Sequence, residues 1–556
     1  GLAHIGVLQV MEELGVTVDV VAGTSMGAVV GGLYAAGYGP DSLAGIVRQL
    51  DWGRVLSDRV DRGYTLPEQR VADERHLVTV PVRGLPPQPA SRLVGGHNVH
   101  QALARLTWPV ATLRDFRRLP IPFAAVATDL ETGEAVVFTG GVLADALAAS
   151  MAIPAVLSPV RLDGRLLVDG MLVRNLPARD ARALGADVLV CSDVSVPLKQ
   201  AEALGTVAGV VSQTLSLLTV GALESERARC DILITPDIEG LGSLDFGSAD
   251  EWIERGRRAA VAVRERLEAL RRVDAARSPR RAPATGTVRV DSIAIPGLAP
   301  PRGRALARRM HLAVPGPLAA ADVERGVDRV FATGAFDKVA YHLERAGARD
   351  GPTVLVVRAA DPGTQTVGLG VRYETQYKAS FLLTATAYER FGSNSIARLD
   401  VRLGEQLRVG GDYHRRFGGG VPWSLGLRAG YDRVPFDRYS GDRRVAAGQF
   451  HIVSGGLFLG AAGGSALLAG LDVKAEHVAQ EPIVAAGDSL AAESQGYWAV
   501  GAALVADTRD YRVFERRGVL VRARTEWARS VSAGGSFAQH YARARAAIPV
   551  TSFLSL

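Results

Sequence analysis

Hydrophobic and polar positions follow three different patterns along the chain. Up to about residue 275, short apolar runs alternate with segments of helical period. The apolar runs that predict strands are 18–22, 123–128, 188–192 and 231–235. This alternation predicts an α/β domain with a parallel sheet covered by helices. The stretch 51–120 is more polar and irregular, which makes it a candidate lid or cap.

The second pattern lies between residues 288 and 358. Strand-like alternation at 288–295 precedes two helical segments, 304–312 and 319–333, and two strand-like runs, 336–343 and 354–358. This order predicts a small β-α-α-β-β unit, although a generic small α/β domain would show the same order. Before it, residues 277–283 are rich in Ala, Arg and Pro, which predicts a semi-stiff linker.

Strict alternation marks the third pattern, which begins after residue 361. Examples are Leu399, Val401 and Leu403 among Arg398, Asp400 and Arg402; Leu471, Val473 and Ala475 among Asp472, Lys474 and Glu476; and Val519, Val521 and Ala523 among Leu520, Arg522 and Arg524. About ten such segments predict a transmembrane β-barrel with a polar interior and a lipid-facing apolar exterior. Tyrosines and tryptophans near the segment ends suit its interfacial girdles. A soluble β-sandwich or barrel would have the same period.

One further apolar run lies inside the first pattern. Residues 203–223 carry no charge and are long enough to suggest a membrane helix. The run contains Gln213 and several Ser and Thr residues, so we expect a buried core helix instead.

Length, charge and cysteine content limit the number of domains and the class of protein. At 556 residues the chain is long enough for about three domains. Its formal charge of +6 is mostly arginine, since the lysines are only Lys199, Lys338, Lys378 and Lys474. No basic cluster interleaved with aromatic residues occurs in the sequence, so no nucleic-acid partner is expected. Cys191 and Cys230 exclude a disulfide-dense scaffold but allow one bridge.

A candidate nucleophile follows the first predicted strand. Gly23, Ser25 and Gly27 form a Gly-x-Ser-x-Gly turn between that strand and a small-residue helix that runs to about Ala36. In this context the serine stands in strained backbone at the helix N-terminus, where free N–H groups and the helix dipole favour an oxyanion. The alternative is a small-residue turn before a buried helix.

A serine nucleophile needs a base, and the sequence offers several. Asp169 ends an apolar run and precedes Gly170; it can serve if burial raises its pKa, although a surface hairpin has the same pattern. An ordinary Ser-His-Asp triad would use His97 or His100. His4 is expected to be a packing residue of the first helix, and His76 a solvated loop residue.

A set of motifs, in this order, resembles the patatin-like phospholipases. They are GLAHIGVL at 1–8, GTSMG at 23–27, ATDL at 127–130, SMAIP at 150–154 and DG at 169–170. The resemblance implies a Ser–Asp dyad, with Ser25 as nucleophile and Asp169 as general base. It implies hydrolysis of lipid acyl esters through an acyl-enzyme, without a metal or cofactor.

The same resemblance assigns the motif residues around the dyad. Gly23, Met26 and Gly27 belong to the serine turn, and Gly170 follows the base. Gly1 looks like the last glycine of the family's oxyanion loop, so we expect the chain to be cut at its N-terminus and not fully active as given. Met171 stands where many family members have a second glycine.

The later regions carry resemblances of their own. Residues 316–318 and 333–339, in their β-α-α-β-β context, resemble a POTRA domain. Asp507 and the FERRG segment at 514–518 resemble a strand-turn motif of the surface-antigen, BamA-like barrels. Those barrels have more strands, and their lid-loop motif is not found before Leu556, so the C-terminus is also expected to be cut.

The whole layout resembles the patatin-like, PlpD-type autotransporters of type V secretion. We expect a hydrolase domain at 1–275, a linker at 276–287, a POTRA-like domain at 288–360 and an incomplete barrel at 361–556. The predicted function is a phospholipase A-type serine hydrolase, exported to the surface of a bacterial cell by its own barrel. The alternative is a secretion or assembly protein of the outer membrane whose patatin-like domain only binds lipid or a partner.

The resemblance also implies partners. The expected ones are membrane phospholipid as substrate and the outer-membrane bilayer around the barrel. A periplasmic chaperone, the barrel-assembly machinery and a second copy of the chain are candidate partners.

Overall fold

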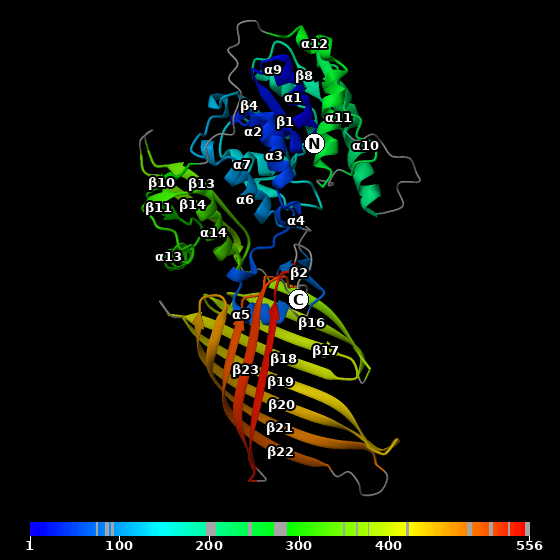
Figure 1. Cartoon of the computed structure of the whole chain (residues 1–556), viewed down its shortest axis with the longest axis vertical. Helices are drawn as coiled ribbons and strands as arrows, with labels where there is room; N and C mark the ends of the chain where they lie inside the picture. Colours follow the sequence, from blue (N-terminus) through cyan, green and yellow to red (C-terminus); the bar gives the residue numbers. More distant parts are fainter. Residues whose placement is uncertain are drawn as a thin grey trace.

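The computed structural model has an α/β part and a small mixed unit at one end and a long curved sheet at the other (Figure 1). It describes residues 1–73, 76–83, 88–89, 94–195, 207–242, 247–271, 286–347, 351–362, 365–375, 377–418, 422–485, 492–510, 515–531 and 534–550. Most of the predicted linker at 276–287 lies outside the described residues.

The N-terminal part alternates helices and short strands, as predicted. Its α-helices are α1 (Ala3–Leu14), α2 (Met26–Ala35), α3 (Pro40–Gln49), α4 (Trp52–Val55), α5 (Pro67–Asp73), α6 (His97–Leu106), α7 (Leu143–Ser150), α8 (Met171–Arg174), α9 (Ala178–Ala183), α10 (Val207–Arg227), α11 (Ala249–Val261) and α12 (Arg264–Glu268). Its strands are β1 (Val21–Thr24), β2 (Val78–Arg83), β3 (Gln88–Pro89), β4 (Phe123–Asp129), β5 (Ala135–Phe138), β6 (Val160–Leu162), β7 (Arg165–Asp169), β8 (Val190–Ser192) and β9 (Ile232–Ile234).

The central sheet of this part has the order β1-β4-β7-β6, and β5 also pairs with β4. Only β1 and β4 run parallel here; β5, β6 and β7 pair antiparallel with their neighbours. The prediction of a parallel sheet was therefore wrong for this sheet, because β6 and β7 form a hairpin across the turn at Asp163 and Gly164. The parallel pair β8–β9 forms a separate sheet.

Helix α1 has the predicted apolar face, with Ile5 and Leu14 buried and a left-handed Gly15 at its C-terminal end. The prediction for α10 was wrong where its side chains are described: Leu217 is 56% exposed and Val220 is 42% exposed. Neither α10 nor any other described helix combines the length and the apolar character that crossing a bilayer would need.

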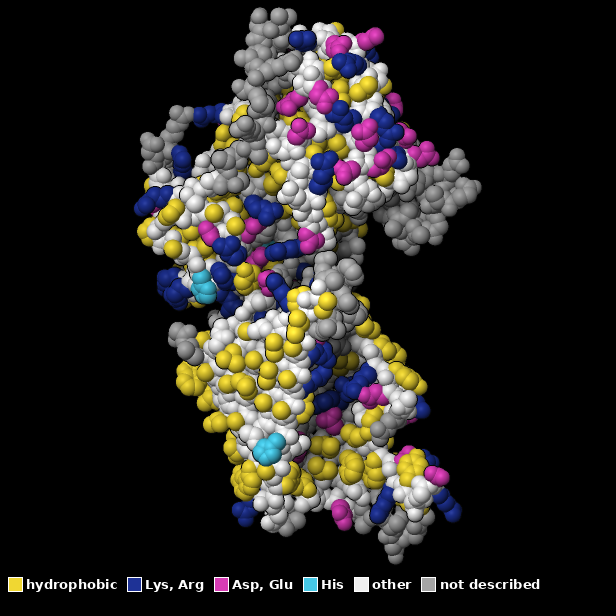
Figure 2. Space-filling model, viewed as in Figure 1, with side chains coloured by type: hydrophobic (Ala, Val, Ile, Leu, Met, Phe, Trp, Pro, Cys, Tyr) yellow, Lys and Arg dark blue, Asp and Glu magenta, His cyan; other side chains and the backbone are white. Residues whose placement is uncertain are grey.

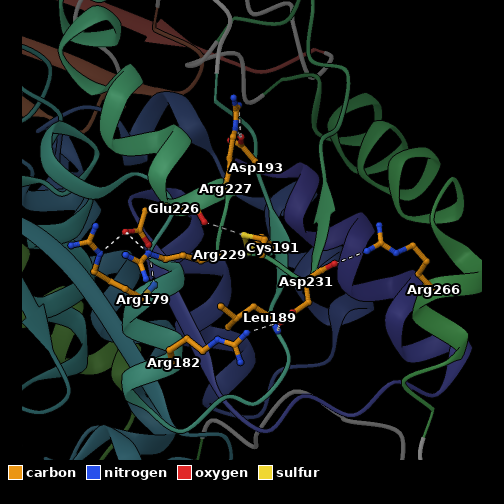
Figure 3. Close-up of a disulfide and its surroundings, with 11 residues drawn as sticks. Arg179, Arg182, Leu189, Cys191, Asp193, Glu226, Arg227, Arg229, Asp231 and Arg266 are labelled. Atoms are coloured by element: carbon orange, nitrogen blue, oxygen red, sulfur yellow. Dashed lines mark hydrogen bonds and ion pairs between the residues drawn. A yellow bond between two sulfur atoms is a disulfide. The ribbon is translucent and has the colours of Figure 1, made fainter.

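A disulfide closes the second sheet of this part. Cys191, in β8, is bonded to Cys230, which precedes β9, across a sequence separation of 39 residues. Figure 3 shows ion pairs of Arg182 with Asp231 and of Arg227 with Asp193 around it. The two cysteines that the sequence left open are thus paired.

The next unit has the predicted β-α-α-β-β order with one addition, a short strand, β12, between its two helices. Its elements are β10 (Val288–Val290), β11 (Ser292–Ala294), α13 (Pro300–Arg309), β12 (Gly316–Leu318), α14 (Ala320–Phe331), β13 (Phe336–Arg345) and β14 (Thr353–Pro362). The first predicted strand is split at Asp291: β10 pairs with the short β12, whereas β11 joins the sheet β11-β14-β13.

This unit packs against the α/β part through a mixed apolar and polar interface. Trp108 and Tyr341 meet edge to face, and both belong to one continuous hydrophobic core. His97 lies 3.1 Å from the Asp328 carboxylate, and Asp145 of α7 accepts hydrogen bonds from His100 and from Arg358 of β14.

The C-terminal part contains ten long strands, β15 to β24, within its described residues. They are β15 (Gln365–Glu374), β16 (Lys378–Tyr388), β17 (Ser395–Leu403), β18 (Leu407–Phe417), β19 (Trp423–Ser440), β20 (Arg443–Gly463), β21 (Leu467–Ala485), β22 (Glu493–Asp507), β23 (Gly518–Ser530) and β24 (Ser536–Ala547). All of them pair antiparallel in chain order, which matches the roughly ten segments that the alternation predicted.

The two faces of this sheet differ as predicted. Leu399 and Leu471 are 52% and 64% exposed on the outside, whereas Arg398 and Asp472 are buried on the inside. Figure 2 shows hydrophobic side chains gathered on the outer face and charged ones in the hollow of the barrel.

The described residues of the stretch 51–120 do not form a separate lid. It supplies α4 and α6 to the α/β part, while β2 pairs antiparallel with β15 and thereby extends the barrel sheet to 12 strands together with β3. His76, expected in a solvated loop, is buried and lies 2.7 Å from the Thr384 hydroxyl of β16. His76 is thus a polar residue that packs against the polar inner face of the barrel sheet.

Candidate active site

Ser25 stands at the sharp turn between β1 and α2, where the sequence placed it. Its backbone has φ 56° and ψ −127°, a strained conformation for a residue with a Cβ atom. The side chain is partly exposed at the N-terminus of α2. The turn thus presents a hydroxyl to solvent next to the positive end of a helix dipole.

Asp169 ends β7 and lies beside Ser25. The Ser25 hydroxyl donates a hydrogen bond of 2.6 Å to Oδ2 of Asp169, and the Met171 amide donates one of 2.9 Å to Oδ1. Burial raises the pKa of the Asp169 carboxyl to about 7, against the opposing effect of these two hydrogen bonds. A carboxylate with that pKa can accept a proton near neutral pH.

Ser150 links the turn at Ser25 to β4 through its side chain. Its hydroxyl donates to the Val126 carbonyl (2.6 Å) and accepts from the Ser25 amide (2.9 Å), and the side chain is fully buried. It therefore fixes the backbone of Ser25 to β4. Ser150 is the first residue of the SMAIP motif, but no periodicity in the sequence could have shown that it contacts Ser25.

The amides of Met26 and Gly27 are candidate donors for an oxyanion. The Ser25 amide is bonded to Ser150, while the amides of Met26 and Gly27 begin α2, where no preceding turn supplies a carbonyl. Gly1 lies against the same turn, since a Cβ on Gly1 would come within 2.4 Å of the Met26 side chain. The structure thus brings Gly1, Ser25, Met26 and Gly27 together.

The other motif glycines differ in how strictly they are needed. A Cβ on Gly23 would come within 2.5 Å of the Gly27 carbonyl oxygen, and one on Gly170 within 2.2 Å of the Val126 oxygen. Both positions therefore require glycine. A Cβ on Gly27 would only make an ordinary 3.5 Å contact with His4, so close packing does not require that glycine.

The candidate histidines His97 and His100 do not contact the Ser25–Asp169 pair. His97 and His100 contact Asp328 and Asp145, so the structure does not bring them together with Asp169 as a triad would require. His4, expected to be a packing residue, is only half-buried: its Nδ1 lies 2.8 Å from the Ser192 hydroxyl, and the loss of solvent around the ring lowers its pKa to about 3.

An apolar cavity lies next to the serine turn. It has a volume of about 570 Å³, including the part open to solvent, and is lined by α1, α2, α3, α4 and α6. Met26, which follows Ser25, and Val29, one helical turn later, are both in its wall. The described residues include no group of three or more His, Cys, Asp or Glu side chains placed to hold a metal.

The raised pKa of Asp169 makes a prediction for pH dependence. If Asp169 accepts the proton of Ser25, only its ionised form is active, and ionisation is half complete at about pH 7. Because a general base is inactive once it is protonated, kcat/KM for an ester should fall about tenfold per pH unit below pH 7 and level off above it. A profile with no inflection between pH 5 and 9 would contradict this assignment.

Comparison with known proteins gives two matches to protein families. Residues 1–182 match the family of patatin-like phospholipases, and residues 355–447 match the OMP85 superfamily. An exposed apolar outer face on an OMP85-type sheet is consistent with insertion into an outer membrane.

Among curated relatives, an uncharacterized NTE family protein of Mycobacterium bovis is 36% identical over 190 residues, which are 34% of this chain and 44% of that protein. Lysophospholipase NTE1 of Pyricularia oryzae is 25% identical over 323 residues, 51% of this chain and 20% of that protein. The matches thus span less than half the length of either relative.

Among solved structures, BamA from Haemophilus ducreyi lacking POTRA domains 1-3 aligns with a TM-score of 0.37 and 15% identity, covering 50% of this chain and 53% of that one. CdiB from Escherichia coli aligns with a TM-score of 0.27 and 13% identity, covering 48% and 52%. From its family matches, the chain carries a domain of the patatin-like phospholipase family in its N-terminal part and a region of the OMP85 superfamily in its C-terminal part.

Proposed function

We propose that the N-terminal domain is a serine hydrolase of lipid acyl esters that uses a Ser25–Asp169 dyad. The observation that carries this proposal is the 2.6 Å hydrogen bond from the Ser25 hydroxyl to a buried carboxylate whose pKa is about 7. A nucleophile and a base within hydrogen-bond reach of each other are the minimum for covalent catalysis.

The geometry supports a two-step reaction. Ser25 Oγ attacks the ester carbonyl carbon while its proton passes to Asp169, and the amides of Met26 and Gly27 stabilise the oxyanion. The proton on Asp169 then goes to the departing alcohol, which leaves an ester of Ser25. Water attacks this acyl-enzyme and gives a proton to Asp169. Asp169 then passes that proton to Ser25 Oγ as the bond from Oγ to the acyl carbon breaks, which releases the carboxylic acid and restores both residues.

The apolar cavity supports a lipid substrate. Because Met26 and Val29 line it directly beyond the nucleophile, an acyl chain bound there would place its ester at Ser25. The cavity has no charged side chain in its lining, which suits a hydrocarbon chain rather than a polar group.

Filling the cavity should therefore change the preferred chain length. Val29→Trp is expected to lower kcat/KM for a long-chain ester about 10²-fold relative to a butyrate ester, because each excluded CH₂ loses about 0.8 kcal/mol of burial. The measurement is the ratio of the two rates with p-nitrophenyl esters. Val137→Trp, at a 40% exposed valine of β5, is the control and should leave the ratio unchanged. If Val29→Trp leaves the ratio unchanged, the acyl chain does not bind in this cavity.

We propose that the C-terminal barrel anchors this hydrolase at the outer membrane and that the β10–β14 unit is a POTRA-like domain between them. The Cys191–Cys230 disulfide supports a site outside the reducing cytoplasm. Display at the cell surface stays a prediction: external protease should then remove the hydrolase domain from intact cells, whereas protection of a folded domain would place it on the periplasmic side.

The test of the proposed function is release of fatty acid from phosphatidylcholine vesicles by the purified full chain in detergent. Release that disappears in Ser25→Ala supports the proposal. Ser25→Ala that releases fatty acid as fast as the parent chain would show that the dyad is not the catalyst. Vesicle binding without any release by either protein would favour a lipid-binding domain.

A further inference from the structure

Helix α7 connects the serine turn to the β10–β14 unit. Its last residue, Ser150, is bonded to the Ser25 amide, and its first turn contains Asp145, which is bonded to Arg358 of β14. Figure 1 shows α6 and α7 on the side of the α/β part that faces this unit. We propose that Arg358 is a positioning residue of the hydrolase, which holds α7 and thereby fixes the backbone of Ser25. This inference rests on the proposed function.

The attachment of α7 is a buried charge cluster. Oδ2 of Asp145 accepts a hydrogen bond from the Arg358 guanidinium, and Oδ1 lies 2.9 Å from Nε2 of His100 in α6. The side chains of Asp145 and His100 are only 4% and 1% exposed, whereas that of Arg358 is 34% exposed. We call these three residues the α7 anchor.

Arg358 supplies the charge that balances Asp145. Burial alone would raise the pKa of Asp145, but its bonds to His100 and Arg358 outweigh burial and hold the pKa below its usual range, so the carboxylate is ionised. Burial lowers the pKa of His100, so its imidazole is uncharged near neutral pH. Of the two groups bonded to Asp145, Arg358 therefore carries the positive charge. A buried ion pair of this kind adds little stability over apolar packing, but it fixes one arrangement of the elements that it joins.

Close packing alone does not hold the start of α7 against the β10–β14 unit. Residues 142–144, where α7 begins, and residues 341–343 of β13 line one cavity of about 300 Å³, including the part open to solvent. Side chains beside a cavity lack contacts on that side and are held less firmly by packing. The position of this end of α7 therefore depends on the bond between Asp145 and Arg358.

The other end of α7 holds the nucleophile. Asp145 and Ser150 are five residues apart, which is about 7.5 Å along a helix. All eight residues of α7 are buried, so a shift at one end is transmitted to the other. Ser25 has a strained backbone with φ 56°, and such a conformation persists only where its surroundings hold it, here through the 2.9 Å bond to Ser150. Loss of the α7 anchor should therefore displace the Ser25 hydroxyl.

The test compares Arg358→Gln, Ser150→Ala and the double variant by kcat of the full chain in detergent on p-nitrophenyl butyrate. Each single variant should lower kcat about tenfold or more, since a displacement of about 1 Å can reduce a rate 10²-fold. KM should change less than about twofold, because neither side chain is placed to bind the substrate. If Arg358 acts through Ser150, the double variant should be no slower than Ser150→Ala alone.

Two further variants make the test specific to the anchor. Arg358→Lys keeps the positive charge beside Asp145 and should recover most of the rate that Arg358→Gln loses. Arg289→Gln makes the same change at a 71% exposed arginine of β10, in the same unit, and should leave kcat unchanged.

The outcomes separate this inference from the proposed function. A parent chain without esterase activity would overturn both. An active parent chain would overturn the inference alone if a folded Arg358→Gln variant keeps its kcat, or if the losses of the two single variants multiply in the double variant.

Asp145→Asn keeps the test decisive if Arg358→Gln does not fold. It removes the same ion pair without leaving a buried charge, because Arg358 is exposed enough to be hydrated and the new amide oxygen can still accept a bond from His100. It should show the same loss of kcat and the same lack of additivity with Ser150→Ala. A folded Asp145→Asn chain with the kcat of the parent would overturn the role of the anchor.

Discussion

Replacing Asp169 with asparagine should lower kcat for ester hydrolysis about 10⁴-fold while the hydrolase domain stays folded. Asparagine keeps the shape of the side chain and can still accept a hydrogen bond from the Met171 amide, but it cannot take the proton of Ser25. The measurement is the rate of fatty-acid release by the full chain at pH 8.

The same substitution should stabilise the domain above pH 7. The pKa of Asp169 is about 7 in the folded chain and about 3.9 when unfolded, so the folded state binds the proton more tightly. Stability is therefore greatest below about pH 4 and falls as the pH rises toward 7, by about 4 kcal/mol in all. Asp169→Asn avoids that cost, so its thermal midpoint should exceed that of the parent chain at pH 8, with a smaller difference at pH 5.

Two controls make this prediction specific. Ser25→Ala should be at least as inactive, and the double variant no worse than Ser25→Ala, because residues that act as a unit are not additive. Asp163→Asn, an exposed aspartate in the turn before β7, should leave rate and stability unchanged. An Asp169→Asn chain that retains more than about a tenth of the activity would contradict the role of Asp169 as base.

Removing the disulfide with Cys191→Ser and Cys230→Ser should destabilise the hydrolase domain by about 3–4 kcal/mol. The bridge closes a loop across a separation of 39 residues, and the loss follows from the larger freedom of the unfolded chain. For a domain of this size the thermal midpoint should drop by about 10 °C. The measurement is thermal unfolding of the full chain in detergent, followed by protease sensitivity of the domain.

Reduction of the disulfide supplies the matched comparison. A thiol reductant should lower the midpoint of the parent chain by a similar amount and should not affect the double serine variant. Equal midpoints for the parent and the double variant would show that the bridge adds nothing to stability. The hydrogen bond between His4 and Ser192 links this region to α1, so the loss should reach the helix that follows Gly1.

Local patterns predicted the elements of the structure well. The apolar run before Gly23 gave β1, the small-residue run after Ser25 gave α2, and the alternation after residue 361 gave ten antiparallel strands. These features depend on residues adjacent in the chain, which is why their period is visible. The contact between Ser25 and Asp169 followed from motif resemblance, since 144 residues separate them.

The same local patterns could not predict contacts between residues that are distant in the chain. No local signal showed that the polar stretch around Glu68 packs into the barrel, because its partners Arg416 and Ser424 lie more than 300 residues away. Whether α10 is buried also depends on which parts of the protein pack against it. An uncharged run fits an exposed helix and a buried one equally well, so the sequence alone did not show that Leu217 and Val220 are exposed. Ser150 belongs to one of the family motifs, but its bond to the Ser25 amide depends on the pairing of distant strands.

The most direct test of the Ser25–Asp169 dyad is labelling of the full chain with a fluorophosphonate, followed by mass spectrometry of the modified peptide. The account predicts one modified residue, Ser25, with labelling that is lost in Ser25→Ala and strongly slowed in Asp169→Asn. Labelling at another serine, or a folded chain in which Asp169→Asn labels as fast as the parent, would contradict it.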